Sequence, residues 1–254
     1  ASAAKYIATS CMEVYQDARV YDTGMICIIE IMGRNAGWLT GAAALSRGED
    51  CDGPDLIYLP ELTFDIEKFT AKVRKLLVKK DVVVVAVSEG IRIQDGRYVS
   101  ELGSASDYVD AFGHKQLTGT ASYLANVIHR DIGCKTRAVE FSTLQRSAAH
   151  LASRVDVNEA FMVGGAAVKA ADEGDSGKMV VIDRVSDDPY QCATGIYDVH
   201  KIANGEKMVP REWITKDGTY VTEEFIDYVR PLIQGDSPSV MVDGIPRHLY
   251  MGKK

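Results

Sequence analysis

The sequence ICIIEIMGRNAGWLTG, residues 26–41, decides the fold of this chain. Its first six residues are apolar except for Glu30, a pattern typical of a parallel strand covered on both faces. The strand ends at Met32-Gly33-Arg34, and the small and aromatic residues that follow predict a helix packed closely on a sheet. Such a turn presents free backbone N–H groups, and its arginine adds a donor suited to phosphate or carboxylate. On spacing alone, an ordinary strand–helix turn with a surface arginine is the alternative.

Composition limits the classes of protein to which the chain can belong. The 254 residues are 46% hydrophobic and 26% charged, which is enough apolar material for one large core or two smaller ones. The net charge is −7 and no basic block occurs, so nucleic acid and anionic membranes are not expected partners. No apolar run reaches the length of a transmembrane helix, and no signal peptide is recognisable.

Cysteine and histidine residues do not form a metal-binding or disulfide pattern. The five cysteines are scattered without a Cys-x-x-Cys pair, which predicts reduced thiols in a cytoplasmic protein. His114 and His150 are interpreted as helix-surface residues, and we expect no metal site among the residues of this chain. The first residues read as part of a helix without an initiator methionine, so we expect the sequence to be the interior of a longer chain.

Hydrophobic periodicity predicts alternating helices and strands. Helices are expected over residues 3–19, 36–47, 65–79, 114–130, 147–172 and 222–230, with a break at Gly164-Gly165. Strands are expected over 26–31, 56–59, 82–87, 137–141 and 178–185, and 91–106 is expected to form a loop or lid. This order predicts an α/β fold with a three-layer, doubly wound, mostly parallel sheet.

Polar residues follow three of the predicted strands, where an open parallel sheet binds its ligands. They are Arg34, Glu89 and the Gln145-Arg146 pair. Two guanidinium groups and a carboxylate in one crevice suit a polyhydroxylated anion, because the carboxylate accepts from hydroxyl groups while the arginines bind phosphate oxygens.

Each of these residues also has a simpler interpretation. Glu89 could be a helix N-cap or an ion-pair partner, and Arg146 an ordinary residue of a first helical turn. Arg137 begins its strand and therefore lies at the opposite edge, so it is either a surface charge or serves a site across a subunit interface. Glu30 lies within an apolar strand, where a carboxylate must be hydrogen-bonded or ion-paired, and its role could be structural.

The motifs together resemble the 6-phosphofructokinase family. MGRNAGWL resembles the sugar-binding signature of that family, and similar segments follow in order along the chain. They are YLPE (58–61), VAVSEG (85–90), DAFGHKQLTGTASYLA (110–125), RAVEFSTLQR (137–146) and HLASRVDVNEA (150–160). The resemblance is strongest to the pyrophosphate-dependent bacterial branch, whose tail is similar to ANGEKMVPREWI and YVRPLIQGD. It implies a phosphofructokinase-like fold.

The resemblance also implies roles for individual residues. Met32, Gly33 and Arg34 would hold fructose 6-phosphate, with Arg34 also stabilising charge in the transition state. Glu89 would bind the sugar hydroxyl groups, and Arg146 would bind the phosphate side of the substrate.

Three further positions bear on the subunit interface and the phosphate contacts. Arg137 would reach the 6-phosphate bound by a neighbouring subunit, which implies a homodimer or homotetramer. Met25 and Thr143 differ from the arginine and histidine of the ATP-dependent type, although Thr143 stays among the expected substrate-binding positions.

Two motifs of the family are absent from this sequence: the Gly-Gly-Asp donor loop and the Thr-Ile-Asp motif with the catalytic base. We therefore expect the C-terminal part of a 6-phosphofructokinase, with the N-terminal donor-binding half absent. The parent enzyme of glycolysis would transfer a phosphoryl group from pyrophosphate or ATP to the 1-hydroxyl of fructose 6-phosphate. Mg²⁺ would be bound mainly by residues outside this chain, and the isolated chain would be inactive.

The expected domain organisation has three parts. Residues 1–145 would form the sugar-phosphate-binding domain, 146–197 would return to the donor domain and expose apolar surface, and 198–254 would wrap back. Two alternatives remain at this point. One is a non-catalytic sugar-phosphate-binding or regulatory module. The other is an unrelated nucleotide-binding protein, which is disfavoured because no G-x-G-x-x-G or Walker pattern occurs.

Overall fold

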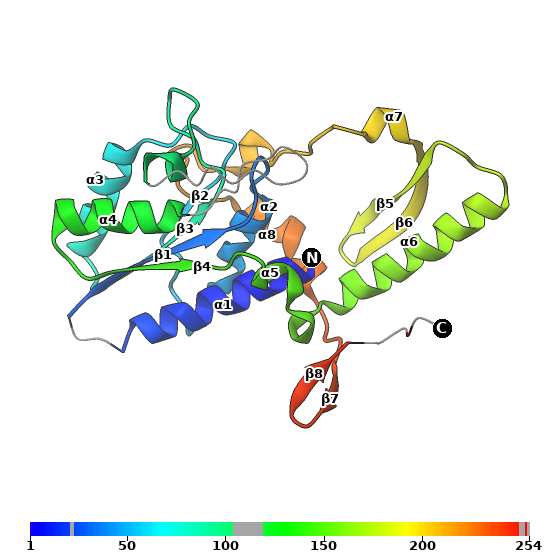
Figure 1. Ribbon diagram of the computed structural model, residues 1–254, viewed down its shortest axis with the longest axis horizontal. Helices are drawn as coiled ribbons and strands as arrows, with labels where there is room; N and C mark the ends of the chain where they lie inside the picture. The colour runs from blue at the N-terminus through cyan, green and yellow to red at the C-terminus, as the bar shows by residue number, and fades with distance from the viewer. Residues whose placement is uncertain (21–22, 104–118, 249–251, 253–254) are drawn as a thin grey trace.

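A computed structural model describes residues 1–20, 23–103, 119–248 and 252, and its centre is a four-stranded parallel sheet (Figure 1). The strand order is β2-β3-β1-β4. The strands are β1 (Met25–Ile31), β2 (Leu56–Tyr58), β3 (Val82–Ser88) and β4 (Thr136–Glu140). Every residue of β1 and β3 is buried, as the apolar runs of these two strands predict.

Helices cover both faces of this sheet. Alternate residues of β1 separate into two cores, with Cys27 and Ile29 in one and Ile26 and Ile28 in the other. Residues of α1 (Ser2–Ala18), the 3₁₀ helix η1 (Ala42–Ser46) and α8 (Glu223–Val229) complete the first core. Residues of α3 (Ile66–Leu77) and α4 (Thr120–Ile132) complete the second. The predicted three-layer, doubly wound α/β fold is therefore confirmed.

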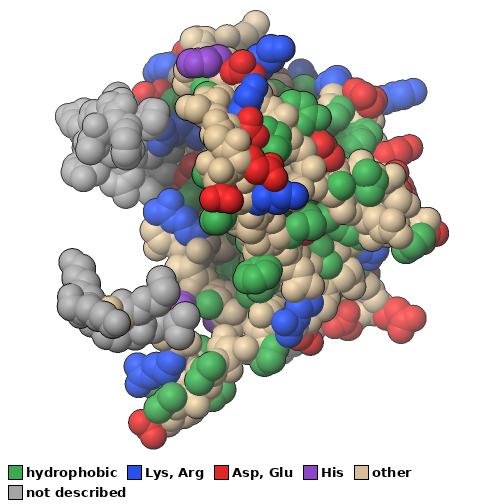
Figure 2. Space-filling view, turned by 90° about the vertical axis from the view of Figure 1, so that its right-hand side faces the viewer, with side chains coloured by type: hydrophobic (Ala, Val, Ile, Leu, Met, Phe, Trp, Pro, Cys, Tyr) green, Lys and Arg blue, Asp and Glu red, His purple; other side chains and the backbone are tan. Residues whose placement is uncertain are grey.

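A lobe stands apart from the sheet (Figure 1). It contains α6 (Arg154–Asp172) and an antiparallel hairpin of β5 (Lys178–Asp187) and β6 (Tyr190–Asp198), followed by α7 (Val199–Ile202). Several large apolar side chains of the lobe are exposed, including Phe161 at 85% and Val168 at 72%. Figure 2 views the molecule from this side and shows apolar side chains interspersed with charged ones. The apolar surface expected for residues 146–197 is thus present.

The C-terminal segment returns from the lobe to the sheet. Trp38 of α2 (Trp38–Gly41) donates from Nε1 to the carbonyl oxygen of Lys207 at 2.6 Å and stacks on Phe225 at 5.8 Å between ring centroids. The segment also contains short 3₁₀ helices and a terminal hairpin: η4 (Arg211–Trp213), η5 (Arg230–Ile233), β7 (Val240–Val242) and β8 (Ile245–Arg247). In the part of the chain that the structure describes, no helix has the length and apolar character needed to cross a bilayer.

The structure differs from the predicted elements in several places. The helix expected over 147–172 begins only at Arg154. The predicted break at Gly164-Gly165 was wrong, because α6 is continuous and a glycine within a well-formed helix costs only about 1 kcal/mol. The helix expected over 36–47 divides into α2 and η1. The sequence analysis missed β6, the partner of β5. Helix α4 begins at Thr120 rather than 114, after Gly119 in a left-handed conformation, and residues 114–118 lie outside the described residues.

Candidate functional site

The turn after β1 contains Met32, Gly33 and Arg34, and its path requires a glycine. A β-carbon at position 33 would lie 2.9 Å from the carbonyl oxygen of Ala36. The backbone N–H of Gly33 donates to Oε1 of Glu89 at 3.3 Å. The end of β1 is therefore joined directly to the end of its neighbour β3.

The turn after β3 interlocks with the turn after β1. Ser88 donates from Oγ to the carbonyl oxygen of Gly33 at 2.6 Å and accepts from the backbone N–H of Gly90 at 3.0 Å. A β-carbon at position 90 would lie 1.8 Å from the carbonyl oxygen of Arg34. Only glycine at position 90 allows the two turns to approach this closely.

The carboxyl group of Glu89 lies where the charged groups of the site converge. Burial raises its pKa, while the hydrogen bond from Gly33 and the positive charges of Arg34 and Arg146 act to lower it. Both guanidinium groups are thus close enough to act on this one carboxyl group. Since the three residues follow β1, β3 and β4, the structure brings the ends of three strands together at Glu89.

The segment after β4 supplies the third part of this arrangement. Ser142 has a positive φ of 43°, an uncommon backbone conformation for a residue other than glycine. The chain then enters α5 (Leu144–Ser147), where Gln145 is buried and accepts from the backbone N–H of Met32 at 3.3 Å. Arg146 and Thr143 are exposed. A cleft of about 530 Å³ is lined by Gln145 and Arg146 together with residues 1–3 and 147–149.

Glu30 lies beneath the site and has a hydrogen-bonded carboxyl group. It is only 4% exposed, and its Oε2 accepts from the backbone N–H of Ala121 at 2.8 Å, at the N-terminus of α4. Burial raises its pKa to about 7, against the opposing effect of that hydrogen bond. These contacts match the structural interpretation of Glu30.

Arg137 is not brought together with the other predicted residues within one chain. It pairs in register with Cys27, at the start of β4, whereas the site lies beyond the other end of the strand. Its guanidinium group forms an ion pair with Asp17 of α1. His150 is exposed in η3 (Ala149–Leu151), and His114 lies outside the described residues.

Sequence reasoning assigned no role to Ser88 and Gly90, which hold the site together, and it did not predict the contact that the amide of Gln145 makes with Met32. The available signal was their position, because each follows a strand end within a few residues of a charged candidate. Among the residues described, no three His, Cys, Asp or Glu side chains form a group that could hold a metal ion.

A protein-family comparison identifies the family to which the chain belongs. The model of the phosphofructokinase family matches residues 1–171, more than half of the chain. The chain belongs to the phosphofructokinase family. The resemblance expected from the motifs is therefore confirmed.

Individual members of the phosphofructokinase family match almost the whole chain. A pyrophosphate–fructose 6-phosphate 1-phosphotransferase of Halomonas elongata is 39% identical over an alignment of 254 residues, and the match covers 99% of this chain and 60% of that protein. The enzyme of the same description from Xanthomonas campestris pv. campestris is 43% identical over an alignment of 253 residues, and the match covers 98% of this chain and 60% of that protein.

A solved structure agrees with these sequence matches. The crystal structure of the pyrophosphate-dependent phosphofructokinase from Nitrosospira multiformis superposes with a TM-score of 0.84 at 34% identity. The match covers 97% of this chain and 58% of that one. The chain thus spans about 60% of the length of the curated relatives it matches.

Proposed function

We propose that this chain binds the sugar-phosphate acceptor of a pyrophosphate-dependent 6-phosphofructokinase. The reaction transfers a phosphoryl group from pyrophosphate to the 1-hydroxyl of fructose 6-phosphate. One observation carries the proposal: the half-buried Glu89 carboxyl group, held by the Gly33 N–H at 3.3 Å, lies within the electrostatic reach of both Arg34 and Arg146. A carboxylate between two guanidinium groups matches the hydroxyl groups and phosphate of this substrate.

Each residue has a role that follows from its position. Glu89 accepts hydrogen bonds from sugar hydroxyl groups, and Arg146, exposed beside its cleft, binds the phosphate. Arg34 extends from the turn after β1 and stabilises the charge that develops on the transferred phosphoryl group. Met32 and Gly33 shape the floor of the site through their backbone, and Thr143 lies one turn before Arg146.

Pyrophosphate is the proposed donor because the relatives from Halomonas elongata and Xanthomonas campestris pv. campestris are named for it, and ATP is the alternative. The resemblance implies Mg²⁺, but the described residues offer no set of ligands that fits this ion. We propose that the donor, its Mg²⁺ and the catalytic base are held by residues outside this chain.

The same proposal explains three features at a distance from Glu89. Residues 1–145 form the acceptor domain, the lobe within 146–197 packs through its exposed apolar side chains on a donor domain, and 198–254 returns to the acceptor domain.

In a homodimer or homotetramer, Arg137 exchanges Asp17 for the 6-phosphate of a neighbouring subunit. The five cysteines are free, which suits a protein of the cytoplasm.

Titration calorimetry with fructose 6-phosphate tests the acceptor site. Glu89→Gln keeps the shape of the side chain but removes its charge, and the exposed Glu13 of α1 provides the matched control Glu13→Gln. We expect Glu89→Gln to weaken binding about tenfold or more and Glu13→Gln to leave it unchanged. Equal affinity in the two variants contradicts the proposed acceptor site.

Incubation of the purified chain with fructose 6-phosphate and pyrophosphate or ATP tests the location of the donor site separately. We expect binding of the sugar phosphate without turnover. Robust turnover by the chain alone contradicts the assignment of the donor site and base to other residues, but leaves the acceptor site unaffected.

A further inference from the structure

The carboxyl group of Glu61, shortly after the end of β2, lies between two segments that are far apart in the sequence. Its Oε1 accepts from the backbone N–H of Gly37 at 2.8 Å and from that of Val209 at 2.9 Å. Gly37 precedes α2 and closes the turn that contains Arg34. Val209 belongs to the strap, residues 203–210, which joins α7 of the lobe to η4 (Figure 1). One carboxylate oxygen therefore joins the Arg34 turn to the strap.

The Arg34 turn packs on Glu61 so closely that position 37 has room only for glycine. A β-carbon there would lie 2.6 Å from Oε2 of Glu61 and 2.9 Å from Cβ of Leu59. The φ of Gly37 is −87°, which any residue can adopt, so the requirement is for space and not for an unusual backbone conformation. Oε2 of Glu61 is buried and has no hydrogen-bond partner among the described residues. The hydrogen bonds of this carboxyl group are therefore concentrated on Oε1.

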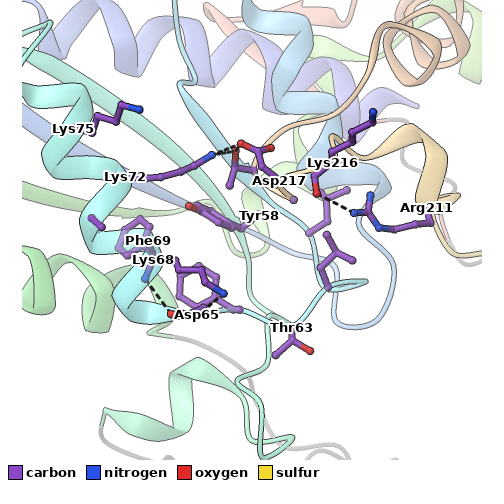
Figure 3. Close-up of a pocket in the computed structure, with 16 residues that line it drawn as sticks. Tyr58, Thr63, Asp65, Lys68, Phe69, Lys72, Lys75, Arg211, Lys216 and Asp217 are labelled. Atoms are coloured by element: carbon purple, nitrogen blue, oxygen red, sulfur yellow. Dashed lines mark hydrogen bonds and ion pairs between the residues drawn. The ribbon is translucent and has the colours of Figure 1, made fainter.

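The segment that follows the strap, residues 211–219, is fastened to the sheet domain. The backbone N–H of Ile57 in β2 donates to the carbonyl oxygen of Thr219 at 2.8 Å. Lys72 of α3 forms an ion pair with Asp217, as Figure 3 shows. The strap therefore leads into a segment whose place is fixed by both β2 and α3.

Two further hydrogen bonds align the Arg34 turn with the strap. Asn35 donates from Nδ2 to Oε1 of Glu206 at 2.6 Å, and Trp38 donates to the carbonyl oxygen of Lys207. Glu206 and Lys207 are exposed, so water competes for both of these contacts. Val209 is buried, with 3% of its surface exposed, which shields its hydrogen bond to Glu61. The contact through Glu61 is therefore the most protected link between the turn and the strap.

The turn that contains Arg34 is thus held at both of its ends. At its start the N–H of Gly33 donates to Glu89, and at its end the N–H of Gly37 donates to Glu61. A displacement of about 1 Å in a group that binds or orients a substrate can lower the rate by roughly a hundredfold. Loss of the Glu61 anchor would release one end of the turn and so displace the Arg34 guanidinium group.

We propose that Glu61 is a positioning residue of the acceptor site, which holds the Arg34 turn in place by joining it to the strap. Glu61 acts on the substrate through Arg34 and not through its own carboxyl group. The effect on substrate binding rests on the function proposed above, whereas the anchoring of the turn depends on the contacts of Glu61 alone. The two parts are therefore tested by separate measurements.

Amide hydrogen exchange of the full chain, followed by NMR at Gly37, Val209 and the buried Val85 of β3, tests the anchor without a ligand. Glu61→Met removes the acceptor, Glu61→Gln keeps an oxygen for both N–H groups, and Glu13→Met at an exposed position of α1 is the control. We expect Glu61→Met to speed exchange at Gly37 and Val209 about tenfold or more relative to Val85, and the other two variants to leave this ratio unchanged. Equal acceleration at all three amides, or none, overturns the anchor.

Titration calorimetry with fructose 6-phosphate tests the positioning of Arg34. We expect Glu61→Met to weaken binding about tenfold and Glu61→Gln to restore most of the affinity. In an Arg34→Ala background the loss caused by Glu61→Met should be much smaller, because no guanidinium group remains to be displaced. Wild-type affinity in Glu61→Met, or an equal loss in both backgrounds, overturns the positioning role. Absence of binding to the wild type would instead contradict the function proposed above, and the exchange measurement would then decide for or against the anchor.

Discussion

Gly90 packs against the backbone of Arg34 so closely that a β-carbon at position 90 would fall 1.8 Å from the Arg34 carbonyl oxygen. This approach joins the turn after β3 to the turn after β1. It therefore fixes the position of Arg34 relative to Glu89, the residue that precedes Gly90. The contact is between backbone atoms, so no change of rotamer can relieve it.

Replacement of Gly90 by alanine should consequently separate the two turns. We expect Gly90→Ala to lower the free energy of unfolding by about 3 kcal/mol or more and to abolish fructose 6-phosphate binding. Urea denaturation and calorimetry measure the two effects. Gly164→Ala is the control, because a β-carbon there meets no atom within 4 Å and should raise stability by about 0.5–1 kcal/mol. Wild-type stability in Gly90→Ala would falsify this account of the turn.

Gly41 and Phe225 provide a similar contact between the sheet domain and the C-terminal segment. A β-carbon at position 41 would lie 2.4 Å from the ring of Phe225 in α8. We expect Gly41→Ala to lower the free energy of unfolding by about 1–3 kcal/mol in the wild-type background. In a background that carries Phe225→Leu, whose side chain is shorter, the loss should be less than half as large. A double-mutant cycle by urea denaturation measures the coupling. If the two losses of unfolding free energy are strictly additive, residues 41 and 225 are not in steric conflict.

Hydrophobic pattern was sufficient to predict the sheet, and α6 and β5 of the lobe, but not β6. Strands β1 and β3 are buried on both faces, so their apolar runs stand out in the sequence. In the hairpin, exposed and half-buried residues alternate irregularly, and β6 carries Gly195 and few large apolar residues. Its strand character comes from pairing with β5, which a reading of single segments does not include.

The charged residues of the site were also predictable, because the ends of parallel strands lie at one edge of a sheet. The contacts that hold them were not. Gly90 is required by the distance to Arg34, and Ser88 by two backbone groups from different turns. These requirements depend on how two loops cross, and the sequence of either loop alone does not contain that information.

Glu30 makes the stability of the protein depend on pH. Its pKa is about 7 in the folded chain, against 4.5 for the unperturbed group, so the native state holds more protons between these values. The contribution of Glu30 to the free energy of unfolding therefore falls as the pH rises from about 4.5 to about 7. Glu30→Gln removes this contribution while keeping an oxygen that accepts from Ala121. We expect the variant to gain up to roughly 3 kcal/mol over the wild type across this interval.

Urea denaturation at a series of pH values from 4.5 to 8 measures this difference. Glu13→Gln, at an exposed position of α1, is the control and should differ from the wild type by the same small amount at every pH. A difference between Glu30→Gln and the wild type that does not change with pH would show that Glu30 ionises normally in the folded chain.

Gln145 joins the third strand end to the first, and its replacement tests whether that contact positions the site. Its Oε1 accepts from the Met32 N–H, while its Nε2 is buried without a hydrogen-bond partner among the described residues. Gln145→Met keeps the length of the side chain but removes the acceptor. We expect it to cost about 1–3 kcal/mol in stability and to weaken fructose 6-phosphate binding several-fold, because the turn that carries Arg34 loses an anchor.

The conservative variant separates positioning from simple loss of stability. Gln145→Glu retains an oxygen for Met32, so it should bind fructose 6-phosphate more tightly than Gln145→Met does, even where the two variants have similar melting temperatures. Gln94→Met, at an exposed loop position, controls for the added methionine. Calorimetry well below the melting temperature gives the affinities. Equal affinity in the Met and Glu variants at position 145 would mean that the Met32 contact supports the fold and leaves the geometry of the binding site unchanged.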